Sequence, residues 1–234
     1  MKLLTTNTKI KKGSKRGFST QGIHFSPFNK SGYQVCKWAS KGCAAACLDT
    51  AGRGQMSNVQ LARINKTKFF FEQKETFKAQ LHKEIEKAVA KAKREKLTPC
   101  FRLNLTSDLP WEKITIADGK TIFQLFPNVQ FYDYTKGFER MKQFINGKGW
   151  PDNYYLTFSR SESNDFAARA VLDLGGNVAM VFRNGLPLTW QGFPVIDGDK
   201  DDLRFLDKPF SIVGLVEKGK AKNDDLGFVI DWRE

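Results

Sequence analysis

The chain has few cysteines and histidines and no long apolar run, and each shortage limits the classes of protein to which it can belong. Four cysteines and two histidines occur among 234 residues. No apolar segment approaches the roughly 20 residues that cross a bilayer, and residues 1–7 lack the apolar core of a secretory signal. We therefore expect a cytoplasmic protein without a membrane partner. In that reducing compartment, clustered cysteines indicate metal binding before disulfides.

Acidic side chains are absent from the first 48 residues. Residues 1–100 carry 21 lysines and arginines against 6 acidic residues, a balance of +15, whereas the remainder carries 17 and 19. This asymmetry favours a polyanion or phosphorylated ligand, so a nucleic acid or nucleotide is the expected partner. Solvated lysine-rich helix faces explain the same composition equally well. Nothing in the composition addresses the oligomeric state.

The common nucleotide-binding and hydrolytic motifs are also missing. The sequence has no Walker A loop, no dinucleotide-binding fingerprint, no zinc-deaminase signature and no recognisable nucleophilic triad. Any chemistry must therefore come from another group of residues.

Three of the four cysteines lie within twelve residues, with the spacing C-x6-C-x3-C. The segment that holds Cys36, Cys43 and Cys47 is short and flanked by glycines and small residues, so it can curl and bring three sulfurs to one point. Thiolates gathered in this way bind zinc or an iron–sulfur cluster. Three protein ligands leave one metal position open, as catalytic sites require. We predict these three cysteines as metal ligands.

Two other residues are candidates to extend this ligand set. Cys100 lies at the start of an apolar run, where it is either a small buried residue or the fourth thiolate of a closed site. His24 precedes the cysteine segment and is either structural or an extra ligand.

The rest of the chain alternates between apolar runs and helical patterns. A strand is predicted at Ile23-His24-Phe25, and a helical region over residues 57–96 with a break near residues 73–76. Further strands are predicted at residues 101–105, 129–134, 154–158, 178–182, 194–196 and 210–213, with helices at residues 122–126, 138–145 and 163–174.

This alternation predicts an α/β fold with a mostly parallel sheet. Six or seven strands are fewer than an eight-unit barrel needs, so we expect a partial (β/α) barrel or an open sheet. The whole chain, residues 1–234, is predicted as one domain. Residues 1–22 form a basic N-terminal arm or edge hairpin, and residues 23–234 form the partial barrel.

Polar side chains follow several of the predicted strands, where parallel α/β folds place their ligands. Helix caps and turns are the alternative explanation for many of these residues. The candidates for cofactor binding are Asn104, Ser107, Asp108, Lys136, Ser159, Arg160, Ser161 and Asn164. The candidates for substrate binding are Arg63, Lys66, Arg102, Tyr134, Asp197 and Asp199.

A strand, a cysteine loop and alternating β/α units together resemble the radical S-adenosylmethionine superfamily. A closer resemblance is to uncharacterised phage and prophage proteins of the "gene product eighty-eight" type, over about residues 20–165. It rests on the C-x6-C-x3-C loop, Gln60-Leu61-Ala62-Arg63, Ser107-Asp108 and Tyr134-Thr135-Lys136. The phage resemblance implies the cytoplasm of a bacterial host.

The radical S-adenosylmethionine resemblance implies a [4Fe–4S] cluster with one open iron that binds S-adenosylmethionine. It further implies an enzyme acting on a nucleotide, nucleic acid or other phosphorylated substrate. Asp108 would bind the methionine amine, and the residues after the strand at 154–158 would bind the carboxylate or ribose. This sequence departs from the superfamily, whose loop is C-x3-C-x2-C and whose second strand ends in Gly-Gly-Glu. The alternative function is nucleic-acid binding by a protein with structural zinc or a structural cluster.

Overall fold

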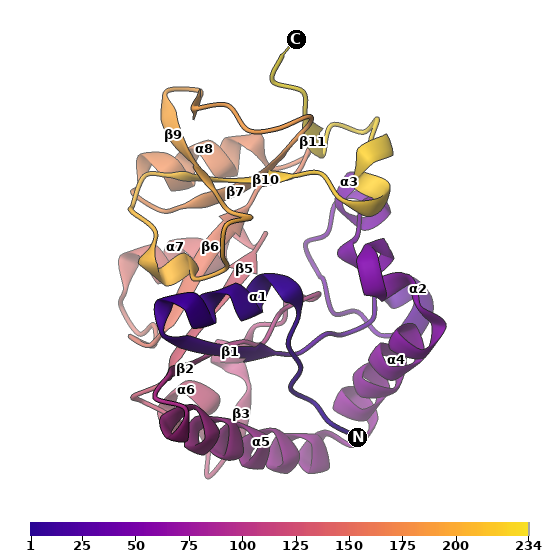
Figure 1. The fold of residues 1–234 in the computed structure, drawn as a ribbon, viewed down its shortest axis with the longest axis vertical. Coiled ribbons are helices and arrows are strands. Elements are labelled where there is room, and N and C mark those ends of the chain that lie inside the picture. Colours follow the sequence, from indigo (N-terminus) through magenta and orange to yellow (C-terminus); the bar gives the residue numbers. More distant parts are fainter. Residues whose placement is uncertain (234) are drawn as a thin grey trace. The chain divides into compact units, whose positions relative to one another are not determined.

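The computed structural model describes residues 1–233, which Figure 1 draws as a ribbon. The chain divides into two compact units. Unit 1 comprises Met1–Lys37, Met56–Asp133 and Gly149–Tyr155. Unit 2 comprises Trp38–Gln55, Tyr134–Lys148 and the chain from Leu156 onward. The cysteine segment is therefore divided, because Cys36 belongs to unit 1 whereas Cys43 and Cys47 belong to unit 2.

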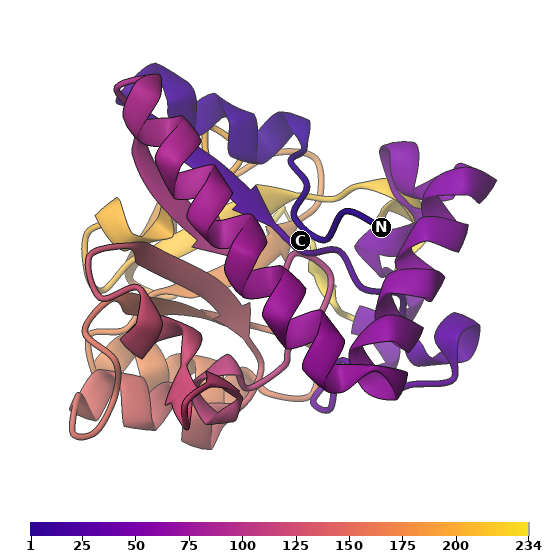
Figure 2. The same cartoon turned by 90° about the horizontal axis from the view of Figure 1, so that it is seen from below.

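Unit 1 is built on parallel strands. Strand β1 (Phe18–Gly22) pairs with β2 (Thr98–Arg102), which pairs in turn with β5 (Gln130–Thr135). The connection from β1 to β2 includes the two long helices α4 (Ser57–Glu72) and α5 (Lys74–Arg94), and α5 packs against β2 (Figure 2).

An aromatic cluster forms part of the unit 1 core. Phe25, Phe70 and Phe77 lie within 5.1–6.1 Å of one another, measured between ring centroids, and all three are buried. Edge-on and tilted packing of this kind adds to the free energy gained from burial. Phe77, Leu81 and Ile85, which recur every four residues along α5, are fully buried, so the apolar face of this helix packs into the core.

The strands of unit 2 are also mostly parallel. Strand β7 (Val178–Phe182) pairs with β10 (Ile212–Val216), and β10 pairs with β9 (Phe193–Asp197). The first part of β7 also pairs with β6 (Tyr154–Ser159), and its last part pairs with the short β11 (Val229–Ile230). Only β8 (Thr189–Trp190) is antiparallel to its neighbour, β9.

Strands β5 and β6 have residues in both units and are neighbours in one nine-stranded sheet. The strand order is β1-β2-β5-β6-β7-β10-β9-β8, with β11 beside β7. Of the two predicted architectures, the structure therefore shows the open, mostly parallel sheet. A barrel is not shown, and the predicted count of six or seven strands was too low because β8 and β11 are only two residues long.

The predicted first strand was placed too late in the sequence. Strand β1 ends at Gly22, and the buried Ile23 and Phe25 follow it. The N–H of Ile23 still donates to the carbonyl of Arg102 at 3.3 Å, so the apolar run continues beside the strand without being part of it. Residues 1–17, which precede β1, contain α1 (Thr8–Lys11) and the 3-10 helix η1 (Lys12–Arg16).

The helices agree with their sequence patterns. The break between α4 and α5 falls at Gln73, where φ is −130° and ψ is 52°. The three predicted connecting helices correspond to α6 (Ile122–Leu125), α7 (Phe138–Asn146) and α8 (Asp165–Asp173). The remaining elements are α2 (Phe28–Ser31), α3 (Lys41–Ala45), a hairpin of β3 (Thr115–Ala117) and β4 (Lys120–Thr121), and the 3-10 helices η2 (Leu48–Thr50), η3 (Gly52–Gln55), η4 (Trp111–Lys113), η5 (Arg204–Leu206) and η6 (Gly219–Asn223).

Within residues 1–233, no helix combines the length and the apolar character that crossing a bilayer requires.

Candidate functional site

The second half of the cysteine segment is fastened to the end of β6 in unit 2. Cys43 lies on α3, whose N-cap Ser40 accepts a hydrogen bond from the Cys43 N–H at 3.2 Å. Glu162, three residues after β6, accepts from the Gly42 N–H with Oε1 at 2.7 Å and from the Ser40 hydroxyl with Oε2 at 2.8 Å. A five-residue helix is too short to be stable by itself. The Glu162 carboxylate therefore holds the helix that carries Cys43.

These hydrogen bonds perturb the pKa of Glu162. Burial raises this pKa, but the Gly42 N–H, the Ser40 hydroxyl and the charge of Arg160 outweigh that effect and lower it below the ordinary value. The contribution of the carboxylate to stability is therefore complete above the ordinary glutamate pKa. It is lost only as pH falls through the lowered value.

The C-terminal part of unit 2 packs against the same helix. A Cβ atom on Gly42 would lie 2.8 Å from Oε2 of Glu162 and 2.9 Å from Cβ of Phe228, so only glycine fits there. Ala46 forms a small buried cluster with Ala221 and Val229. The helix that carries Cys43 therefore packs against residues that lie about 180 positions further along the chain.

Strand β11 brings this C-terminal segment to the site. It pairs with Val181 and Phe182 of β7, just past the point where β6 pairs with Val178 and Ala179. The Arg160 guanidinium donates to the carbonyl oxygens of Gly227 and Phe228. β6 pairs with the first part of β7, and β11 pairs with the last part of the same strand.

A lysine and an aromatic ring lie at the ends of the neighbouring strands. Lys136, just after β5, donates from Nζ to the Ser159 hydroxyl at 2.6 Å. The same ammonium lies 5.5 Å from the centre of the Phe228 ring, within the range of a cation–π contact. The cofactor candidates Lys136 and Ser159 thus contact each other, in the same unit as Cys43 and Cys47.

The other candidates after β6 bind one another. The Ser161 N–H donates to Oδ1 of Asn164 at 2.6 Å, and Nδ2 of Asn164 donates to the Ser159 carbonyl at 3.1 Å. Arg160 pairs with Asp165 through two hydrogen bonds of 2.6 and 3.0 Å. These contacts match the helix-entry alternative for this run. They do not test ligand binding.

Cys36 lies in unit 1, beside the loop after β2. Its thiol contacts the Thr106 carbonyl at 3.9 Å, and the Asp108 N–H donates to the Val35 carbonyl at 2.8 Å. The structure therefore places the first cysteine next to the Ser107-Asp108 motif.

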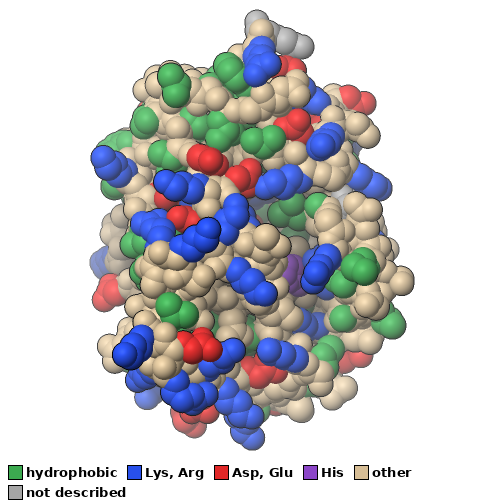
Figure 3. Space-filling model, viewed as in Figure 1, with side chains coloured by type: hydrophobic (Ala, Val, Ile, Leu, Met, Phe, Trp, Pro, Cys, Tyr) green, Lys and Arg blue, Asp and Glu red, His purple; other side chains and the backbone are tan. Residues whose placement is uncertain are grey.

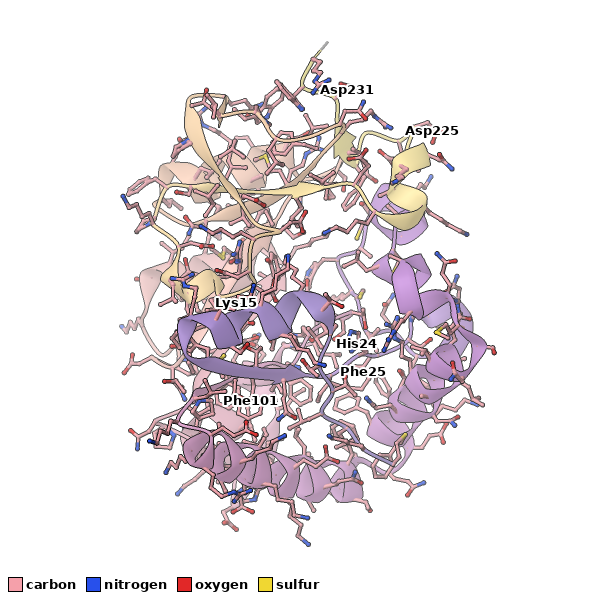
Figure 4. The ribbon with its side chains drawn as sticks, viewed as in Figure 1. Lys15, His24, Phe25, Phe101, Asp225 and Asp231 are labelled. Atoms are coloured by element: carbon pink, nitrogen blue, oxygen red, sulfur yellow. The ribbon has the colours of Figure 1, made fainter. Side chains whose placement is uncertain are left out.

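All four cysteines are thiols. Cys36, Cys43 and Cys47 are partly exposed, and the Cys47 sulfur accepts from the Asp49 N–H at 3.5 Å. Cys100 is fully buried and lies 3.0 Å from the Thr20 hydroxyl, as expected for a core residue. His24, labelled in Figure 4 beyond the end of β1, lies with Nδ1 3.1 Å from the Thr5 hydroxyl.

No group of three or more histidine, cysteine, aspartate or glutamate side chains is arranged to hold a metal ion in the described part of the chain. The structure thus shows three partly exposed thiols and not an assembled metal site. The assignment of Cys36, Cys43 and Cys47 as ligands remains a prediction from their spacing.

A buried polar network surrounds Asn104 in unit 1. Asp133, which is 0% exposed, accepts from the Asn104 N–H at 2.7 Å and from the Tyr154 hydroxyl at 2.9 Å. Oδ1 of Asn104 in turn accepts from the Ser107 hydroxyl at 2.7 Å and from Nε1 of Trp111 at 3.3 Å. The structure thus brings the cofactor candidates Asn104 and Ser107 together, and this network shapes the loop that carries Asp108.

The predicted substrate-binding residues are scattered over both units. Arg63, Lys66 and Arg102 lie in unit 1, and Tyr134, Asp197 and Asp199 lie in unit 2. Tyr134 donates to Asp202 at 3.3 Å, beside the buried Arg204. The Asp199 carboxylate accepts from the Val216 N–H and pairs with Lys218, whereas Asp197 accepts from the Asp199 N–H. None of these contacts tests a substrate-binding role.

Lys66 holds the start of the chain. Its side chain is buried and donates from Nζ to the Leu3 carbonyl at 2.7 Å, while Glu84 accepts from the N–H groups of Leu3 and Leu4. Burial has the largest effect on the pKa of Lys66; the attraction of Glu84 opposes it and the charge of Arg63 adds to it, and the net result is a pKa lowered to about 8.

This lowered pKa has a measurable effect on stability. Between about pH 8 and the ordinary lysine value, the unfolded chain binds more protons at Lys66, so the free energy of unfolding of unit 1 rises with pH. We expect the rise from this residue to be on the order of 3 kcal/mol. Denaturant titrations from pH 7.5 to 10.5 should show it in the wild type but not in Lys66→Met. Parallel pH curves for the two proteins would contradict this assignment.

Two residues of the site were not assigned from the sequence. Glu162 was not among the candidates, although it lies within residues 159–164, which supplied four of them, and Phe228 lies in a segment without a strong pattern. The buried Asp133 was missed as well, although a carboxylate between two tyrosines of a predicted buried strand is a usable signal, because parallel strands are usually apolar on both faces.

A family model described as gene product 88 matches residues 1–231. No curated protein and no solved structure matches the chain.

Proposed function

The chain belongs to the gene product 88 family, and we propose that it is an iron–sulfur protein whose ligands are Cys36, Cys43 and Cys47. Within this proposal it is a radical S-adenosylmethionine-like enzyme. Its substrate class is a nucleotide, a nucleic acid or another phosphorylated molecule. Zinc is the alternative metal.

The observation that supports this proposal is the difference between the three clustered cysteines and the fourth. Cys36, Cys43 and Cys47 are partly exposed thiols, as loading with a metal requires, whereas Cys100 is fully buried. The close spacing of the three in the sequence suits a set of three thiolate ligands that leaves one position on the metal open.

The chain's own residues have definable roles in this proposal. Glu162 and Ser40 hold the helix of Cys43, and Gly42 permits their close approach. Lys136 places a positive charge at the ends of β5 and β6, where a phosphate or carboxylate of a ligand would be attracted. A bound cluster with S-adenosylmethionine would supply the radical chemistry.

Metal and sulfide analysis after anaerobic reconstitution tests the proposal. We expect about four iron and four sulfide ions per chain in the wild type. Cys43→Ala should lose most of both, whereas the matched control Cys100→Ala should retain them because that thiol lies in the core. Stoichiometric zinc without iron, or equal metal content in wild type and Cys43→Ala, would overturn the iron–sulfur proposal.

The enzymatic part has a separate readout. A reduced, cluster-loaded protein should release methionine from S-adenosylmethionine, and Cys43→Ala should not. Loaded wild-type protein that releases no methionine would overturn the radical S-adenosylmethionine assignment while leaving the iron–sulfur assignment standing.

A further inference from the structure

The N-terminal helical segment of unit 1 presents a basic face. Lys11, Lys12, Lys15 and Arg16 are all exposed, and no acidic residue occurs before Asp49 in the sequence. Figure 3 shows lysine and arginine side chains gathered in the region where Figure 4 labels Lys15. We call these four residues the basic face.

The basic face is held on a fixed scaffold. Asn7 caps α1 by accepting from the N–H groups of Lys9 and Ile10 at 2.9 and 3.1 Å, and Gly17, with φ of 81°, ends η1. Ile10 is 1% exposed, and Gly13 is also buried, so one side of the segment packs inward.

Helical spacing places the lysines together on the other side. Lys11, Lys12 and Lys15 are separated by one, three and four positions, and residues three or four apart are neighbours on a helix surface. The four side chains therefore form a short row of positive charge, over roughly 10 Å from Lys11 to Arg16 at the 3-10 rise of about 2 Å per residue.

We propose that the basic face binds the phosphate backbone of a nucleic acid. Phosphates recur along each strand at about 3.4 Å of helix axis, so a row of this length meets several of them. The segment contains no aromatic side chain between Thr8 and Gly17 for stacking on bases. Binding is therefore electrostatic and indifferent to base sequence.

The surroundings of the face favour nucleic acid over other polyanionic partners. A membrane-binding helix pairs its lysines with exposed apolar residues that enter the lipid, whereas the exposed neighbours here are Thr8 and Ser14. A stable protein interface has an apolar core, and Ile10, the one large apolar residue of the segment, is buried.

The test compares two charge-matched double variants. Lys11→Gln/Lys15→Gln removes two charges from the basic face, and Lys83→Gln/Lys87→Gln removes two exposed lysines from α5 in the same unit. Both variants have the same net charge, and neither alters a buried side chain. Binding to fluorescent 20-nucleotide single strands and duplexes is measured by anisotropy from 50 to 200 mM salt.

We expect wild-type affinity to fall steeply as salt increases. Lys11→Gln/Lys15→Gln should bind at least tenfold more weakly at 100 mM salt, with the log–log salt slope reduced by about 1.8 for duplex and about 1.4 for single strand. The α5 variant should stay within about threefold of the wild type. Equal losses in the two variants would show a net-charge effect alone and overturn the proposal.

Other results also decide the matter. Absence of salt-dependent binding in the wild type overturns it, and so does binding to phosphatidylserine vesicles without binding to either oligonucleotide. The inference stands apart from the metal proposal, because Cys43→Ala should bind the oligonucleotides normally and Lys11→Gln/Lys15→Gln should take up metal normally.

Discussion

Replacing Asp133 by alanine is expected to lower the free energy of unfolding of unit 1 by about 3–5 kcal/mol. The carboxylate is completely buried and accepts from the Asn104 N–H, from Nδ2 of Asn104 at 3.2 Å and from the Tyr154 hydroxyl. Alanine leaves these buried donors without their acceptor. Each such unsatisfied group costs roughly 1–3 kcal/mol. Chemical denaturation followed by tryptophan fluorescence would measure the loss.

A graded series separates this effect from the loss of side-chain volume. Tyr154→Phe removes one donor and keeps the carboxylate, so we expect a cost of about 1 kcal/mol. Asp133→Asn keeps the shape but turns an acceptor into a donor facing other donors, so its cost should lie between those of Tyr154→Phe and Asp133→Ala. A cost for Asp133→Asn no larger than that for Tyr154→Phe would contradict the proposed network.

Replacing Glu162 by alanine is expected to free the helix that carries Cys43 and raise the reactivity of its thiol. The carboxylate makes two hydrogen bonds, to Gly42 and Ser40, and a five-residue helix has little stability of its own. Losing both bonds, at a partly exposed position, should favour local opening by about 2 kcal/mol. The labelling rate of Cys43 should therefore rise roughly 30-fold.

Residue-resolved alkylation, read out by peptide mass spectrometry, tests this prediction. Glu162→Gln keeps one acceptor for the Gly42 N–H and should give an intermediate rate. Glu139→Ala is the matched control, because Glu139 lies in the first turn of α7, where its carboxylate pairs with Lys142 at 2.7 Å. The buried Cys100 should stay unlabelled throughout. A Cys43 rate that is the same in Glu162→Ala and Glu139→Ala would refute the role of Glu162.

The candidate site shows which contacts local sequence patterns can identify and which they cannot. Asn104 and Ser107 were both candidates for cofactor binding, and they lie together because they are three residues apart on one loop. Lys136 and Ser159 were predicted separately from the ends of two strands, and they meet because β5 and β6 are neighbours. The partner of Asn104 is Asp133, 29 residues away, and no local signal identifies such a pair.

The amino-acid sequence by itself determined the alternation of strands and helices, the mostly parallel sheet, the helix break at Gln73 and the family, since periodicity and motifs are properties of neighbouring residues. Only the tertiary structure decided that β11 lies beside β7 and that Glu162 reaches Ser40 and Gly42 from 120 or more residues away. Contacts of this kind depend on which strands pair and where each strand ends. That choice is made by the packing of the whole sheet, so the residues that hold the cysteine helix became visible only once the chain was folded.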